Sequence, residues 1–90
     1  MADLKIGKFY LQRNQGSNLI LAVGKVENIS NNVHFGVKVD LDILDVTGAK
    51  IGMVSDVIRE LKPHAPWEFL ATVSNLKAAS VCFASIKEDR

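Results

Sequence analysis

The sequence is poor in the residues that would place it in several common protein classes. It has one cysteine, Cys82, two prolines and one tryptophan, and its longest apolar run covers only residues 19–23. A single thiol allows no disulfide within the chain, which argues against a small secreted scaffold held together by disulfides. The apolar run is far shorter than the roughly 20 residues that cross a bilayer. We therefore expect a soluble domain without direct membrane insertion.

Targeting information is also scarce. The first residues, MADLKIG, lack the apolar core of a signal peptide. This leaves the compartment open, because a domain excised from a longer exported or membrane-anchored protein would have the same composition.

The sequence also has no large excess of positive or negative charge. Eleven basic and ten acidic residues leave a formal net charge of +1, and no run of Lys or Arg concentrates it. A surface that neutralises several phosphates needs such a concentration, so we expect no nucleic-acid partner. The sequence also has no glycine-rich phosphate loop and no His or Cys at metal-ligand spacing. We expect no cofactor, no metal site and no enzymatic activity.

What the sequence does have is enough apolar material for one core. Hydrophobic residues make up 48% of the 90 residues and charged residues 23%, which is typical of a folded domain rather than a disordered chain. Nothing in the chain separates two cores. We therefore predict a single domain over residues 1–90.

The clearest pattern lies at residues 33–44, where apolar and polar side chains alternate. Successive side chains of an extended strand point to opposite faces, so this spacing predicts a half-buried strand. The predicted inward row is Phe35, Val37, Val39, Leu41 and Ile43. The predicted outward row is His34, Gly36, Lys38, Asp40 and Asp42.

Similar patterns predict further strands over residues 4–11, 18–28, 50–54, 67–73 and 80–86. Turn-forming residues separate them at 13–18, 29–32 and 45–48. Residues 55–61 fit either a short helical turn or an irregular strand. Six or seven short strands without a helical segment indicate an all-β antiparallel sandwich, with a small barrel as the alternative.

Several short motifs between residues 23 and 73 carry a family resemblance: GKVEN at 24–28, VKVDLDILD at 37–45, Gly48 and Gly52, LKP at 61–63 and WEF at 67–69. Together they resemble the FxLYD-type domain, a small immunoglobulin-like module of bacterial and archaeal proteins that often carry membrane anchors or other domains. Of the four namesake positions only Asp45 is kept, and Leu41, Ile43 and Leu44 replace the others. The resemblance implies an immunoglobulin-like β-sandwich, and the family has no shared catalytic residues to carry over.

The one acidic cluster consists of Asp40, Asp42 and Asp45. Carboxylates two residues apart on a strand share a face and could contribute to a calcium site, but calcium needs six or more oxygen ligands and the sequence supplies no loop with the rest. We therefore interpret the cluster as a solvated face.

Four other residues have a functional and a structural interpretation. Trp67 could stack on a sugar ring, but it shares the parity of Phe69 and Val73, which favours a core tryptophan. Cys82 is expected to be a small buried hydrophobe. His34 and His64 are expected to face solvent.

The least explained feature is a second apolar row in the strand predicted at residues 18–28. It consists of Leu19, Leu21 and Val23, on the face opposite Ile20, Ala22 and Val26. An outward Leu70 would extend this second row. A monomer rarely exposes a large apolar patch, so this row either lies under the N-terminal strand, changes face at a bulge near Gly24, or contacts a protein partner. Strand addition at a sheet edge is a second way to bind a protein partner.

We expect a non-catalytic accessory or protein-interaction module. The alternative is a ligand-binding sandwich, with carbohydrate at Trp67 or calcium at the acidic cluster.

Overall fold

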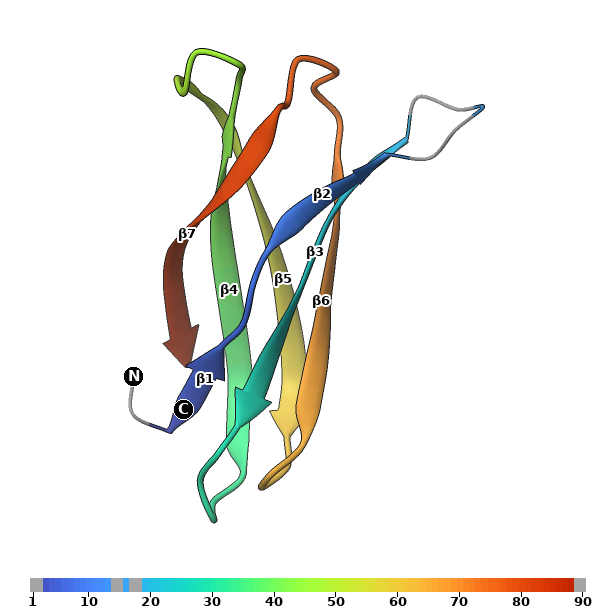
Figure 1. Ribbon diagram of the computed structural model, residues 1–90. Coiled ribbons are helices and arrows are strands. Elements are labelled where there is room, and N and C mark those ends of the chain that lie inside the picture. Colours follow the sequence, from blue (N-terminus) through green and yellow to red (C-terminus); the bar gives the residue numbers. More distant parts are fainter. Residues whose placement is uncertain (1–2, 14–15, 17–18, 89–90) are drawn as a thin grey trace.

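The computed structural model (Figure 1) describes residues 3–13, 16 and 19–88, which form seven strands and no helix. The strands are β1 (Leu4–Ile6), β2 (Tyr10–Arg13), β3 (Ile20–Asn28), β4 (His34–Leu44), β5 (Lys50–Leu61), β6 (Pro66–Val73) and β7 (Ser80–Glu88). The predicted all-β class is thereby confirmed, and residues 55–61 belong to a strand. Within the described ranges there is no helix that could span a membrane.

Two antiparallel sheets face each other (Figure 1). In the first, which we call the β3 sheet, β3 lies between β6 on one edge and β1 followed by β2 on the other. The second, the β4 sheet, has the order β5-β4-β7. All pairs are antiparallel, so this is the predicted sandwich.

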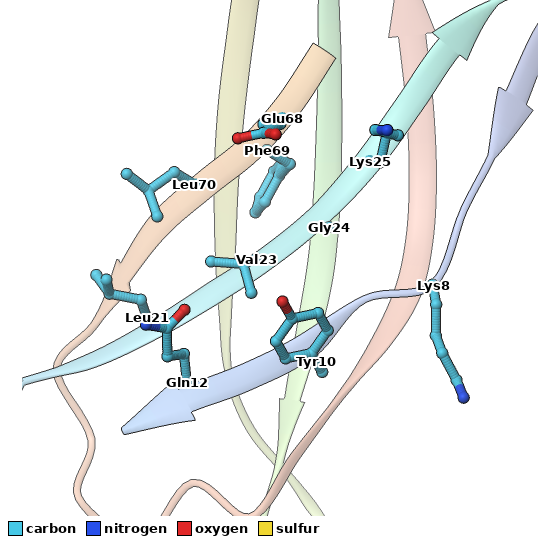
Figure 2. Close-up of a pocket in the computed structure, with 10 residues that line it drawn as sticks. All are labelled: Lys8, Tyr10, Gln12, Leu21, Val23, Gly24, Lys25, Glu68, Phe69 and Leu70. Atoms are coloured by element: carbon cyan, nitrogen blue, oxygen red, sulfur yellow. The ribbon is translucent and has the colours of Figure 1, made fainter. Parts of the chain in front are cut away.

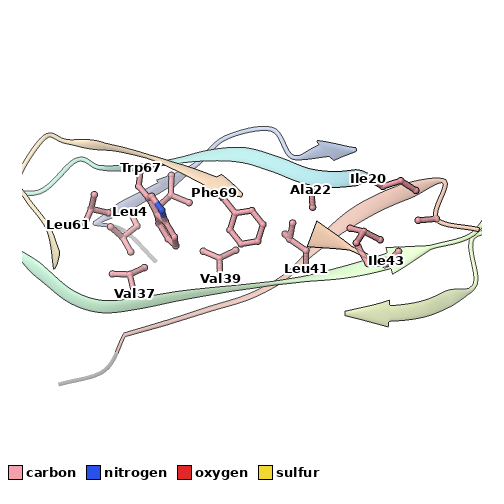
Figure 3. Close-up of a cluster of buried hydrophobic side chains, with 13 residues drawn as sticks. Leu4, Ile20, Ala22, Val37, Val39, Leu41, Ile43, Leu61, Trp67 and Phe69 are labelled. Atoms are coloured by element: carbon pink, nitrogen blue, oxygen red, sulfur yellow. The ribbon is translucent and has the colours of Figure 1, made fainter. Parts of the chain in front are cut away.

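The core lies between the sheets and contains the predicted inward residues with one exception. The side chains of Val37, Val39, Leu41 and Ile43 are buried, and they face Trp67 and Phe69 of β6 and the inner side of β3 (Figure 3). The alternation in β4 and β6 therefore has its expected cause, because burying apolar side chains stabilises the fold by about 1.5–3 kcal/mol each.

The start of β4 departs from the prediction. Phe35, predicted to lie inside, is 54% exposed, whereas His34, predicted to lie outside, is 5% exposed. Gly36 lies between them and Val37 with φ at 59°, in the left-handed region that breaks the alternation of an extended strand. His34 therefore turns inward, where its Nδ1 hydrogen-bonds Glu88 and its Nε2 lies 3.3 Å from the hydroxyl of Ser30.

The predicted N-terminal strand over residues 4–11 is interrupted. Ile6 pairs with Val26 and Tyr10 pairs with Val23, so three residues on this side, 7–9, stand opposite two on β3. This extra residue is a bulge, and it divides the strand into β1 and β2.

The turns at 29–32 and 45–48 are confirmed. Asn28, fully buried, is bound on both sides of its amide: Nδ2 donates to the carbonyls of Asn32 and Leu61, and Oδ1 accepts from the backbone and hydroxyl of Ser30. At the second turn the N–H of Gly48 donates to the carbonyl of Asp45 at 3.0 Å. Most of the predicted loop at 13–18 lies outside the described residues.

Both open sides of the sandwich are bridged. Between β5 and β6, the carboxylate of Asp56 accepts a hydrogen bond from the backbone N–H of Leu70 at 3.3 Å. On the opposite side, the ring of Phe9, just before β2, stacks on Phe83 of β7 with centroids 6.4 Å apart, and Arg13 of β2 donates to the carbonyl of Ala78, just before β7. These contacts join the two sheets beyond the core itself.

Candidate functional site

The outer face of the β3 sheet brings apolar side chains from three strands into one row, in which Tyr10 and Leu70 are exposed and Val23 is half-buried. Val23 on β3 pairs with Tyr10 on β2 and with Leu70 on β6, and Tyr10 and Leu70 are 56% and 55% exposed. The next row on this face has Leu21 between Gln12 and Thr72. We call Tyr10, Leu21, Val23 and Leu70 the apolar patch (Figure 2).

The patch contains most of the residues predicted for a protein contact. Leu21, Val23 and Leu70 lie together, while Leu19 is exposed just before β3 begins. Tyr10 was missed. Its exposed position becomes apparent only from the pairing with Val23, which depends on the bulge at residues 7–9.

The two structural alternatives for this row do not hold. β1 and β2 pair along the edge of β3 and do not lie over its outer face. β3 also keeps one register with β6 through eight consecutive pairs, from Ile20 with Val73 to Glu27 with Pro66, so it has no bulge at Gly24. The bulge lies opposite, in residues 7–9, and in the described structure the patch remains on the surface.

The patch lines a shallow open depression of about 570 Å³ (Figure 2). It forms where the N-terminal strand bends away from β3 at the bulge, beside Gly24 and Lys25. Its charged lining residues are Lys8, Lys25 and Glu68. This lining offers apolar contact, two ammonium groups and one carboxylate to a bound molecule.

The three carboxylates of the predicted acidic cluster have separate partners. Asp40 accepts hydrogen bonds from the hydroxyls of Ser55 and Ser85 on the two flanking strands. Asp42 lies 3.2 Å from the ammonium of Lys50, and Asp45 binds its own turn. Among residues 3–13, 16 and 19–88, no three His, Cys, Asp or Glu side chains are grouped to hold a metal ion.

Two of these carboxylates have shifted proton affinities. The hydroxyl of Ser55, with Ser85 and nearby lysines, lowers the pKa of Asp40 below its ordinary value, against an opposing contribution from burial. The side chain of Thr47 and the backbone N–H of Ala49 lower the pKa of Asp45 in the same direction. Both effects are typical of carboxylates that accept hydrogen bonds in structural roles.

The other candidates from the sequence are placed as follows. Trp67 is in the core, 8% exposed, with its ring 6.2 Å from that of Phe69. Cys82, predicted to be buried, is exposed, because it lies on the outer side of edge strand β7, paired with Asp42. His64 faces solvent as expected and lies 2.9 Å from Asn31, whereas the same expectation for His34 is wrong.

Comparisons with family models, curated proteins and solved structures gave no match. The FxLYD resemblance therefore stays a prediction from the motifs.

Proposed function

We propose that this chain is a non-catalytic accessory module that binds another protein or domain through the apolar patch. The row of Tyr10, Val23 and Leu70 on the outside of the β3 sheet carries the proposal. Tyrosine is among the residues that most often dominate interface energies, and a contiguous exposed apolar row is typical of a contact surface.

The size of the patch favours a transient contact. Three strands about 4.8 Å apart and two rows about 6.8 Å apart cover on the order of 200 Å². A stable interface between folded proteins buries about 800 Å² on each partner. The patch is therefore suited to a small or reversible contact rather than to a permanent one.

The sheet edges at β5, β6 and β7 are less suited to binding by strand addition. β7 carries an extra residue, Ala84, between the pairs Asp40–Ser85 and Leu41–Phe83, and β5 carries Ile51 between its last two pairs with β4. Bulges of this kind twist an edge away from an incoming strand. The edge of β6 is engaged by Asp56. We therefore favour the face over the edges.

We also infer that the sandwich is immunoglobulin-like and related to the FxLYD-type modules of bacterial and archaeal proteins. The motifs between residues 23 and 73 support this inference, as does a chain that crosses between the sheets after β3, β5 and β6. Such a module would act as a domain of a larger exported or membrane-anchored protein.

The alternative ligand-binding function has less support. The indole of Trp67 is buried and offers no free face to a sugar, and the acidic cluster is divided among three sets of partners. A glycan array and a calcium titration test these alternatives directly.

The proposed function is tested by capturing partners from the source cell with three baits: the wild type, Leu70→Gln and Val57→Gln. Val57 is the matched control, because it is also 55% exposed but lies on β5, in the other sheet. We expect the wild type and Val57→Gln to retain the same partner and Leu70→Gln to lose it. Equal capture by all three baits would show that the patch is not the binding surface.

A further inference from the structure

We propose that the apolar patch binds an extended, acidic segment of a partner protein, with apolar side chains over the row of Tyr10, Val23 and Leu70 and carboxylates at Lys8 and Lys25. This inference rests on the proposed function and names the chemistry of the partner. Shape, charge and row spacing support it.

The shape of the surface favours a narrow convex occupant. A two-fold contact between copies of this chain would place the same patch on both sides. Two open depressions of about 570 Å³ facing each other leave a void, whereas interfaces pack as closely as protein interiors. A single extended segment can enter the depression, and its small footprint fits the area of the patch.

The charge of the surface favours an acidic occupant. Lys8 and Lys25 both line the depression against the single carboxylate of Glu68, and within the described residues neither lysine forms an ion pair. Figure 2 shows both lysines on the side of the depression away from Leu70. An acidic partner would supply the missing countercharge.

The outer face of the β4 sheet shows the contrast. There Lys38 lies 3.9 Å from Asp40, and Lys50 lies 3.2 Å from Asp42. Lys38 and Lys50 therefore form ion pairs within the chain. Lys25 has Glu68 as its cross-strand neighbour but, like Lys8, forms no ion pair within the described residues, so both ammonium groups are available to a carboxylate of a partner.

The spacing of the rows predicts a pattern in the partner. Gln12–Leu21–Thr72, Tyr10–Val23–Leu70 and Lys25–Glu68 are successive rows on one face. Rows on one face of a sheet repeat about every 6.8 Å, which is also the repeat of every second residue in an extended peptide. A segment that follows the strands would carry apolar side chains at two alternate positions and an acidic side chain at the next alternate position.

The test selects ligands from a displayed library of random short peptides against the wild-type protein. We expect enriched peptides to combine alternating apolar residues with Asp or Glu, and to bind more weakly as salt is raised. Two variants then separate the contributions: Leu70→Gln, and the double variant Lys8→Glu/Lys25→Glu. We expect each to lower the affinity for the selected peptides about tenfold or more.

Matched controls are Val57→Gln for the first variant and Lys62→Glu/Lys77→Glu for the second; both of these lysines are exposed, lie in loops and do not line the depression. Both controls should bind the selected peptides like the wild type, and thermal unfolding should show that all four variants are folded.

Three outcomes would contradict the inference. If the selected peptides are basic or uncharged, and Leu70→Gln loses their binding while the lysine double variant keeps it, the acidic segment is overturned and the proposed function still stands. Failure to select any peptide, or equal peptide binding by Leu70→Gln and Val57→Gln, counts against the inference and against the proposed function. A dimer in light scattering that Leu70→Gln dissociates identifies a second copy as the occupant and also overturns the inference.

Discussion

The ring of Phe9 occupies the place that a side chain on Gly24 would need. A β-carbon built on Gly24 would stand 2.1 Å from Cδ1 of that ring, closer than any real contact. Phe9 reaches this position because the bulge at residues 7–9 turns it inward, where it meets the ring of Phe69 edge-on with centroids 5.4 Å apart. The ring of Phe9 can therefore pack against β3 only because residue 24 is a glycine.

Gly24→Ala should consequently destabilise the fold by about 1–3 kcal/mol, the usual cost of forcing extra volume into a packed site. Urea unfolding measures the change. Gly52→Ala is the control, because nothing lies within 4 Å of the place that a β-carbon on Gly52 would take, and it should be close to neutral. In a Phe9→Ala background Gly24→Ala should cost much less, and an unchanged cost in that background would show that the ring is not the cause.

Asn28 should be the most sensitive polar residue of the core. Its buried amide makes four hydrogen bonds that hold the turn between β3 and β4 and the end of β5, and Ala would leave the carbonyl of Leu61 without this donor. Buried polar groups left unpaired cost about 1–3 kcal/mol. We expect Asn28→Ala to lower the free energy of unfolding by about 2–4 kcal/mol, which calorimetry would record as a melting temperature lower by roughly 10 °C or more.

The control for this change is Asn31→Ala in the same turn. The side chain of Asn31 is exposed and bonds only His64 among the described contacts. Its loss should change the stability by less than about 0.5 kcal/mol. If both substitutions lower the free energy of unfolding equally, the loss comes from changing any side chain of this turn and not from the hydrogen bonds of the buried amide.

Much of the sandwich could be predicted because its core strands alternate regularly. The inner rows of β4 and β6 and the turn at Asp45 and Gly48 follow from local spacing and turn chemistry alone. The reversal at His34 and Phe35 could not be predicted, because it depends on the positive φ of Gly36, and a glycine in a strand pattern does not reveal its φ.

The candidate site was predictable to a similar degree. Leu21 and Val23 stood out because a strand with apolar residues on both faces needs a second partner for one of them. Tyr10 and Lys8 could not be assigned to the same surface, because their position relative to β3 depends on a one-residue bulge that shifts the register.

Cys82 should react with a thiol reagent in the folded protein. The residue is exposed on edge strand β7, and within the described part of the chain its Sγ has only the weak 3.7 Å contact with the carbonyl of Phe83. An aromatic disulfide reagent should therefore label one thiol per chain at a rate close to that in denaturant. Cys82→Ser should abolish labelling and leave the stability within about 0.5 kcal/mol. If labelling requires denaturant, the thiol of Cys82 is buried in the folded protein, as the sequence predicted.

The carboxylate of Asp40 should make the stability of the β4 sheet depend on acid. Its pKa in the folded protein is lowered from the ordinary value, first because the hydroxyl of Ser55 donates to it and then because Ser85 does so from the other side. A group with a lowered folded pKa stabilises the fold above its unfolded pKa and loses that contribution as the pH falls through the folded value. Urea unfolding between about pH 5 and pH 2 should therefore show a declining free energy of unfolding in the wild type and a shallower decline in Asp40→Asn. Ser55→Ala keeps the carboxylate but removes the largest cause of the shift, so it should flatten the same part of the curve. If Asp40→Asn and the wild type decline in parallel, the acid sensitivity comes from other carboxylates, with Asp45 in its turn as the first to examine.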